Sequence, residues 1–203
     1  MTVNFLKIPL FVVFLTTSSI LKADPYSLVN LSQYLQNLKI LKADFSQTNP
    51  DDTISSGTIL IKRPGRMRFE YYKPDTTLVL VSAGALAIFD PKGDKEPITY
   101  PFKNNPISLV ITGEVDLLNS GIVENYEKSS EEAVLTIRDP KKPERGSVEM
   151  VFTGAKPELK KFTIKNENGS STSISLKDIE YPKKLNETLF SIPLETNKRR
   201  AQN

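Results

Sequence analysis

The chain has 203 residues, of which 38% are hydrophobic and 25% charged, a composition typical of one soluble globular domain. It contains no histidine, cysteine or tryptophan, which excludes His/Cys metal sites, Ser-His-Asp and Cys-His catalytic groups, and disulfides. The formal charge of +3, from 27 basic and 24 acidic residues, is too balanced to indicate a nucleic-acid-binding protein.

Residues 1–23 have the pattern of a secretory signal peptide. The early positive charge of Lys7 precedes an apolar run that is too short to span a bilayer, and the segment ends on the small residue Ala23. We expect cleavage after Ala23, with Ser18 as the alternative site. Cleavage would leave one domain, residues 24–203. Because bacterial lipid anchoring requires a cysteine after the apolar run, we expect the mature protein to be free in the periplasm.

The mature chain begins with a predicted amphipathic helix over residues 26–41. Its leucines recur at intervals of three and four residues, and Asp24-Pro25 marks its start. After this helix the hydrophobic period falls to two, which predicts antiparallel strands separated by turn residues. The predicted strands cover residues 41–47, 57–63, 66–72, 78–82, 85–90, 121–128, 133–139, 147–153, 159–165 and 171–179, with a short last piece at 190–192.

Three segments refine this pattern. The strands at 78–82 and 85–90 are apolar on both faces, so both of their faces must be covered. Residues 106–111 and 115–118 interrupt the strand pattern and are expected to form two short helical turns. The basic cluster at 198–200 is expected to be a solvated tail. Together these elements predict an open, strongly curved antiparallel sheet or half-barrel in a single domain.

The remaining residue types give no signature of catalysis. Without histidine, the options are paired carboxylates, a Ser-Lys pair or an all-oxygen metal site. The acid pairs Asp51-Asp52 and Glu131-Glu132 lie in polar turns, where solvated acids are common. The glycines are scattered singly, so the sequence contains no phosphate-binding loop. We therefore expect no enzymatic activity, no catalytic residue, no metal and no cofactor.

The basic and aromatic stretch 63–73 does not fit single-stranded nucleic acid. Strand alternation places Arg66 and Arg68 on the face opposite the aromatic rings, whereas stacking on nucleic acid requires cations and rings on one surface. We expect no nucleic-acid partner.

Several short motifs follow one another along the chain in a recognisable order. They are Ala43-Asp44-Phe45-Ser46-Gln47, the strand from Gly57 that ends in Lys62-Arg63-Pro64-Gly65, Phe89-Asp90-Pro91, and Phe190-Ser191-Ile192-Pro193. In this order the mature chain resembles the periplasmic outer-membrane lipoprotein carrier family (LolA-like), with Phe69 where that family usually has tryptophan. The resemblance implies an α+β, mainly β fold: a half-open curved antiparallel β-barrel, with an N-terminal helix and short lid helices covering an apolar cavity.

The resemblance also implies a function. Such a carrier holds the acyl chains of acylated lipoproteins, takes them from an inner-membrane ABC lipoprotein-releasing transporter and passes them to an outer-membrane lipoprotein receptor. We expect a monomer. Exposing an acyl chain costs about 0.8 kcal/mol per methylene, so a ~14-carbon chain in water costs on the order of 10 kcal/mol and needs a shield. A carrier function therefore agrees with the strands that are apolar on both faces.

The candidate site has three parts. The residues expected to bind acyl chains are Ile59, Ile61, Met67, Phe69, Tyr71, Leu80, Ile88 and Phe89. The expected lid residues are Leu109, Val110, Leu117 and Leu118. Arg63 matches the family's arginine, which is implied to latch the lid by hydrogen bonds to helix-end groups, a task suited to a planar guanidinium with five donors.

Other interpretations remain open at this point. Each apolar candidate could be an ordinary core residue, and Arg63 could be a solvated residue at a strand end. The alternative functions are a periplasmic carrier of another lipid or glycolipid, a non-catalytic protein-interaction module whose sheet stays filled, and an exported carboxylate hydrolase.

Overall fold

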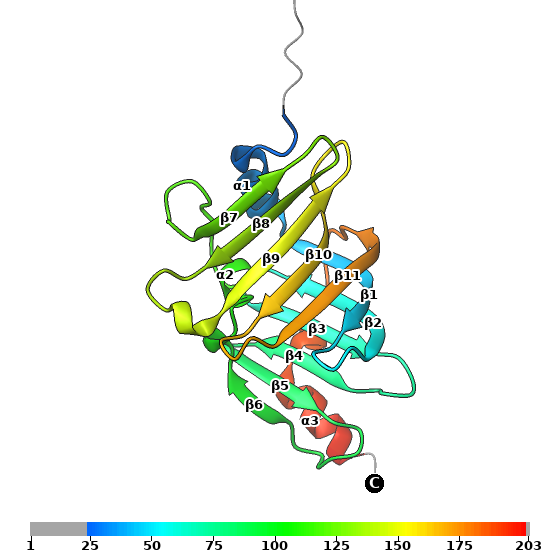
Figure 1. Ribbon diagram of the computed structural model, residues 1–203. Coiled ribbons are helices and arrows are strands. Elements are labelled where there is room, and N and C mark those ends of the chain that lie inside the picture. The colour runs from blue at the N-terminus through cyan, green and yellow to red at the C-terminus, as the bar shows by residue number, and fades with distance from the viewer. Residues whose placement is uncertain (1–23, 202–203) are drawn as a thin grey trace, which may run out of the picture.

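Eleven antiparallel strands form one strongly curved sheet (Figure 1). The computed structural model describes residues 24–201, so the expected signal peptide at 1–23 lies outside the described residues. The strands are β1 (Ile40–Thr48), β2 (Ile54–Lys62), β3 (Arg66–Tyr71), β4 (Leu78–Ser82), β5 (Ala85–Phe89), β6 (Ile98–Pro101), β7 (Val123–Lys128), β8 (Glu132–Arg138), β9 (Ser147–Thr153), β10 (Glu158–Lys165) and β11 (Ser171–Glu180). The helices are α1 (Leu28–Asn37), η1 (Phe102–Asn104), α2 (Ser108–Ile111), η2 (Pro143–Arg145), η3 (Glu187–Phe190) and α3 (Ile192–Arg200).

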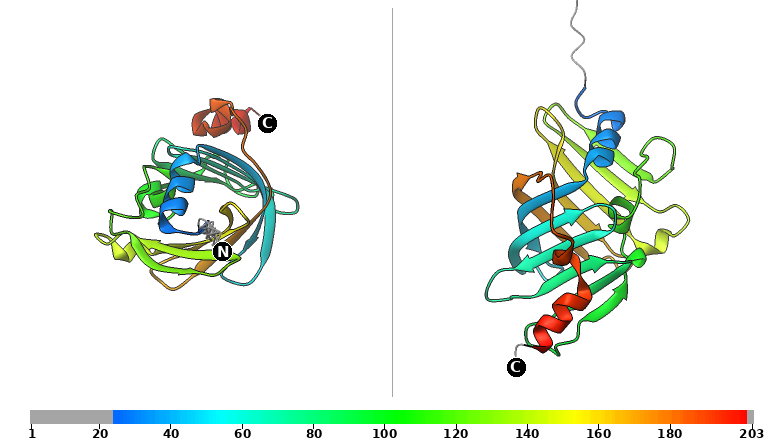
Figure 2. Two further views of the ribbon diagram at one scale, coloured as in Figure 1. Left: turned by 90° about the horizontal axis from the view of Figure 1, so that it is seen from above. Right: turned by 180° about the vertical axis from the view of Figure 1, so that it is seen from behind.

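The strand order is β6-β5-β4-β3-β2-β1-β11-β10-β9-β8-β7, so β1 pairs with β11, and β6 and β7 stand at the two edges. Viewed from above, the sheet curls around α1, and η1 and α2 lie between the two edge strands (Figure 2). The predicted half-open, mainly β barrel is therefore confirmed. Strand β6 was not predicted, because its four residues carry no alternation and follow a loop rich in charge and proline. No helix between residues 24 and 201 is long and apolar enough to cross a bilayer.

Helix α1 is shorter than predicted because both of its ends are fixed locally. The hydroxyl of Ser27 accepts a hydrogen bond from the Asn30 amide at 3.3 Å and caps the helix, which begins at Leu28, two residues later than expected. At the other end Leu38 is already extended, and β1 starts at Ile40. The helix buries Leu31 and Leu35 against the concave face of the sheet.

The segment after α2 is a turn where a second short helix was expected at 115–118. The carboxylate of Asp116 accepts hydrogen bonds from the amides of Leu118 and Asn119, both at 3.0 Å. Such side-chain bonds compete with helical hydrogen bonds. The turn still packs inward, because Ser32 of α1 donates to the Val115 carbonyl at 3.3 Å.

Strand alternation divides the apolar residues of β2–β5 between a concave and a convex face. In the cross-strand pairing, Ile59, Phe69, Val79 and Ile88 form one concave row. The neighbouring convex row contains Leu80, which pairs with Arg68 and Ala87. The concave face belongs to the main core with α1 and α2, whereas a second cluster on the convex face contains Leu78, Leu80, Ala87 and Phe89.

The C-terminal segment, which contains η3 and α3, covers the convex cluster. The expectations of a strand piece at 190–192 and of a solvated tail at 198–200 were therefore wrong. Ser191 caps α3 by accepting from the Leu194 amide at 3.3 Å, and the proline that follows fits the first helical turn. Ile192 packs on the convex cluster. The guanidinium of Arg199 lies 4.9 Å from the centre of the Phe89 ring, and Arg200 pairs with Glu96. The basic cluster is therefore part of an ordered helix, in which Arg199 contacts the sheet and Lys198 and Arg200 remain exposed.

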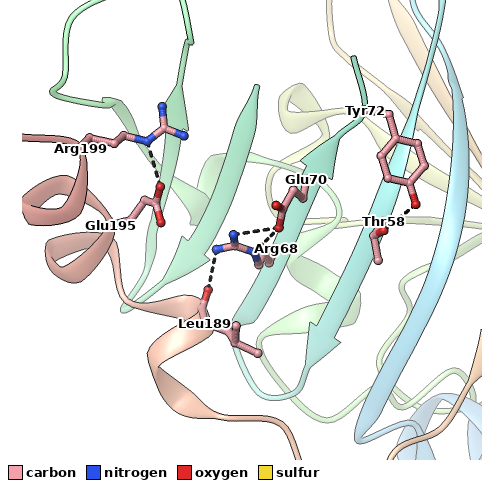
Figure 3. Close-up of polar contacts among 7 residues, drawn as sticks. All are labelled: Thr58, Arg68, Glu70, Tyr72, Leu189, Glu195 and Arg199. Carbon is pink, nitrogen blue, oxygen red and sulfur yellow. Dashed lines mark hydrogen bonds and ion pairs between the residues drawn. The ribbon is translucent and has the colours of Figure 1, made fainter. Parts of the chain in front are cut away.

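Polar contacts continue under this segment (Figure 3). Arg68 of β3 donates to the Leu189 carbonyl of η3 at 3.1 Å and pairs with Glu70 at 2.9 Å. Within α3, Arg199 pairs with Glu195 at 2.9 Å. The C-terminal segment is thus held by backbone, ionic and apolar contacts together.

Candidate functional site

The concave face of β2 and β3 forms the deepest part of the apolar interior. Ile59, Ile61 and Met67 are almost fully buried there and share one cluster with α1 and α2. The register pairs Ile61 with Met67 and Ile59 with Phe69, which brings these predicted acyl-binding residues together on one face. The sequence alternation therefore placed these four side chains on the same face as the structure does.

Along β3 the apolar face becomes more open with distance from the β2–β3 turn. Phe69 and Tyr71 are only half-buried, and Phe45 of β1 packs edge-on against both rings at centroid distances of 5.4 and 5.1 Å. On β5, Ile88 is also half-buried and pairs with Ile98 of the edge strand β6. The side chain of Ile98 is 57% exposed. The concave layer thus continues from a closed interior to solvent.

Tyr71 carries a polar group on this apolar face. Its hydroxyl donates to Gln47 Oε1 at 2.8 Å. Burial raises the pKa of Tyr71 to about 12, so the phenol is neutral at physiological pH. The side chain therefore offers an apolar ring whose polar tip is already bonded.

Phe45 is a member of this face that the candidate set omitted, although the alternation of Ala43 and Phe45 could have indicated it. Gly57 makes room for it: a Cβ at this glycine would lie 2.2 Å from the Glu70 carbonyl oxygen and 2.9 Å from the Phe45 ring. Val79 and Val81 of β4 were also missed, because β4 is apolar on both faces.

Leu80 and Phe89 do not lie on the concave face with the other candidates. Both are buried in the convex cluster beneath α3. The physical reason is that Leu80 pairs with Arg68, whose side chain points to the outer face, and Phe89 pairs with Leu78. Their expected placement on the acyl-binding face is corrected to the face that α3 covers.

Three of the four expected lid residues face the core. Val110 of α2 and Leu117 of the following turn are buried in the main cluster, and Leu109 packs against it. Leu118 is 53% exposed and lies outside the cluster's buried set. These residues are in direct contact with the sheet, so apolar side chains occupy the interior in this arrangement.

Arg63 lies directly after β2 and joins the turn to both covering helices. Its Nη1 donates to the carbonyls of Leu35 and Leu38, the latter at 3.3 Å, and its Nη2 donates to the carbonyl of Gly113. The first two acceptors lie at the C-terminal end of α1, where carbonyls lack intrahelical partners and carry partial negative charge. The third follows α2. A single cation thus contacts the ends of both covering helices.

The backbone of the same turn adds two contacts. The Arg63 amide donates to the Lys39 carbonyl at 2.8 Å, and the Gly65 amide donates to the Ile111 carbonyl at 2.9 Å. Burial lowers the pKa of Arg63, but a guanidinium stays protonated in proteins. Its Nε is buried with no hydrogen-bond partner among residues 24–201. The arginine is therefore partly desolvated, and its two terminal nitrogens donate to carbonyls at the helix ends.

A solvent-open pocket of about 600 Å³ lies beside Arg63 and is lined in part by Lys39, Gly113 and Glu114. Water therefore reaches the outer side of these contacts. Hydrogen bonds that water can replace are weaker than fully enclosed ones. Arg63 therefore joins the ends of α1 and α2 to the β2–β3 turn at a place that solvent can reach.

Comparison with known proteins agrees with this architecture. Residues 36–193 match the family described as outer membrane lipoprotein carrier protein LolA. An outer-membrane lipoprotein carrier protein of Coxiella burnetii (strain CbuK_Q154) is 26% identical over 183 residues, 85% of this chain and 85% of that protein. One from Methylococcus capsulatus is 27% identical over 133 residues, which span 61% of this chain and 62% of that protein's length.

Among solved structures, a LolA superfamily protein from Nitrosomonas europaea is similar at 13% identity and a TM-score of 0.42, over 79% of this chain and 97% of that one. The family match is the stronger finding, because it runs from the last two residues of α1, through the whole sheet and the Arg63 turn, to the start of α3. The chain therefore belongs to the outer membrane lipoprotein carrier protein LolA family.

Proposed function

We propose that this protein is a periplasmic carrier that binds the acyl chains of lipoproteins on its concave face and moves them from the inner to the outer membrane. Its N-terminal residues 1–23 would be removed on export, and the domain over 24–203 would act as a monomer without cofactor or catalysis. It would receive cargo from an inner-membrane ABC transporter and deliver it to an outer-membrane receptor. Family membership supports a lipoprotein carrier role.

The observation that supports the proposal is an apolar sheet face covered by helices that are joined to it through one arginine. The interior side chains Ile59, Ile61 and Met67 are covered by α1 and α2, and Arg63 fastens the ends of both helices through backbone carbonyls. Removing a cation from water costs free energy, so a partly desolvated arginine on these helix ends supports a role beyond stability.

Exchange between cover and cargo can be close to balanced. Opening would expose apolar side chains such as Leu35 and Val110, and an acyl chain would replace them on the sheet. Both processes scale with apolar area at roughly 25 cal/mol per Å². Because the two terms have opposite sign, binding and release can both proceed without an external energy source on the carrier itself, and a partner can shift the balance.

Photo-crosslinking tests the proposal at single positions. A photoreactive residue at Phe69, on the half-buried concave face, should capture acylated proteins in the periplasm. The matched control is Tyr72, an exposed aromatic whose hydroxyl contacts Thr58 on the convex side (Figure 3). Equal capture at both positions, or none at Phe69, would contradict an acyl-binding concave face. Analysis of the captured species would separate lipoproteins from other lipids or glycolipids.

The filled interior also fits one alternative, a non-catalytic interaction module. In that case the helices never leave the sheet, and a fluorescent fatty-acid probe would not bind. Saturable probe binding that competes with an unlabelled acyl chain would support a carrier. Failure to bind at any concentration below the probe's own aggregation would support the interaction module.

A further inference from the structure

The turn that carries Arg63 is held from the outside of the sheet as well as from the inside. After β11 the chain crosses the convex face of the neighbouring strands, forms η3 and ends in α3 (Figures 1 and 2). Arg68 binds this segment at the Leu189 carbonyl, as Figure 3 shows. Phe190, which belongs to the same segment, is fully buried. The C-terminal segment therefore lies firmly on the outer face beside the β2–β3 turn.

One carboxylate of this segment contacts both strands that flank the turn. Glu187, the first residue of η3, accepts a hydrogen bond from Lys62 Nζ at the end of β2. Its second oxygen lies 3.1 Å from Arg66 Nε at the start of β3. Lys62 also donates to the Leu185 carbonyl at 3.3 Å, and its side chain is only 18% exposed. Glu187 thus bridges the two fixed ends of the turn.

The bridge counteracts a repulsion built into the strands. Lys62 and Arg66 are direct cross-strand partners, so two cations stand opposite each other at the base of the turn. Like charges at opposed positions destabilise a strand pair. A carboxylate between them replaces repulsion by attraction, and the hydrogen bond from Lys62 lowers the pKa of Glu187, which keeps it ionised at neutral pH.

The residues between these two cations contact the lid. Arg63 and Gly65 bind α1 and the end of α2 on the inner side, through the side chain and the backbone respectively. Splaying the two strand ends would therefore shift the same atoms that hold the helices. We propose that Glu187 is a positioning residue for Arg63. Glu187 holds the β2–β3 turn so that the guanidinium of Arg63 stays aligned with the helix-end carbonyls.

This inference rests on the proposed role of Arg63 as the lid latch. It adds that the C-terminal segment, which does not touch the acyl-binding face, sets how tightly the lid is held. Glu187 is 59% exposed, so its effect should be modest. A partner that approached this outer face and competed for Lys62 or Arg66 would loosen the lid without contacting it.

Site-resolved hydrogen exchange on the cargo-free protein tests the proposal. The amides of Gly65 and Thr112 donate to the carbonyls of Ile111 and Ser108 respectively, so their exchange rates report on the contact of the turn with α2 and on α2 itself. In Glu187→Gln both amides should exchange about two- to fivefold faster than in the wild type. Glu187→Asp keeps the charge and should restore most of the protection. The matched control, Glu180→Gln, changes a glutamate of similar exposure that pairs with Lys42 away from the turn, and it should leave these amides unchanged.

A second arm shows whether Glu187 acts through Arg63. In an Arg63→Leu background, Glu187→Gln should add nothing to the exchange of the Thr112 amide. An unchanged rate in the single variant, no recovery with Asp, or the same acceleration in both backgrounds would overturn the inference. Probe binding is measured separately: failure of the wild type to bind a fluorescent fatty acid would refute the carrier function, whereas normal binding with unchanged exchange would refute the role of Glu187 alone.

Discussion

Arg63 places a permanent cation against the carbonyl ends of two helices that cover an apolar sheet. Three carbonyls share its two terminal nitrogens, and no charged acceptor is among them. Hydrogen bonds from charged donors contribute more than neutral ones, but here water can replace them through the adjacent pocket. The residue therefore fits a reversible fastening better than a permanent structural tie.

Replacing Arg63 by Leu should leave the protein folded but loosen the lid. Loss of these hydrogen bonds should lower the free energy of unfolding by about 1–2 kcal/mol and speed exchange of the Thr112 amide by about tenfold. Circular dichroism checks folding, and urea unfolding measures stability. Arg63→Lys, which keeps the charge but loses the planar fork, should give an intermediate rate. Wild-type exchange together with wild-type transfer in a reconstituted assay would contradict the latch role.

Tyr71 predicts a loss of stability at high pH. Its pKa is raised by burial to about 12, so the neutral phenol stabilises the fold below pH 10, and this contribution disappears as the pH rises from 10 through 12. The wild type should therefore lose on the order of 2 kcal/mol more than Tyr71→Phe between pH 9 and 11.5.

Urea unfolding of both proteins at the two pH values measures this difference. Other tyrosines titrate in both proteins, so only the difference between them reports on Tyr71. Equal losses in wild type and variant would show that the ring of Tyr71 is not enclosed beside Phe45 as the structure has it.

At the level of elements, the sequence predicted most of the sheet because its strands alternate cleanly. In β3 every second residue is apolar, and glycine, proline or aspartate marks most of the turns, so strand limits were correct within about three residues. Helix α1 was overestimated, because the leucine period runs on into β1 and only the Ser27 cap shows where the helix starts. Periodicity cannot distinguish the end of a helix from a strand that continues the apolar run.

The face of β4 and β5 could not be predicted from the pattern. Leu78 to Val81 are all apolar, so alternation gives no direction, and only pairing with β3 assigns Leu80 to the outside. What covers the outside is α3, whose weak amphipathic pattern and basic end resemble a solvated tail. The signal that could have revealed it was Ser191 before Pro193, an N-cap followed by a proline in the first turn.

Helix α3 should stabilise the fold through Ile192. Replacing Ile192, which packs on the convex cluster, by Ala should lower the free energy of unfolding by about 1–2 kcal/mol. The matched control is Leu194→Ala on the same helix, where a side chain that is 51% exposed should matter by less than about 0.5 kcal/mol. Equal values in urea unfolding would show that α3 does not rest on the sheet through this face.

At the scale of the whole molecule, one sheet separates two tasks. Its concave face holds the proposed acyl site under α1 and α2. Its convex face carries η3 and α3, and Glu187 of η3 contacts both strands of the β2–β3 turn. Arg63, the proposed latch, lies in the β2–β3 turn, which is contacted from both sides of the sheet.

The sequence itself supplies a clean reporter for the central claim, because it contains no tryptophan. A single tryptophan at Phe69 would report from the concave face, and a single tryptophan at Tyr72 would report from the convex side of the sheet. Acyl chains carrying bromine quench tryptophan only on close contact. Brominated acyl chains should saturably quench Phe69→Trp and leave Tyr72→Trp unaffected. Equal quenching of both reporters, or no quenching at position 69, would contradict binding of acyl chains between the lid and the sheet.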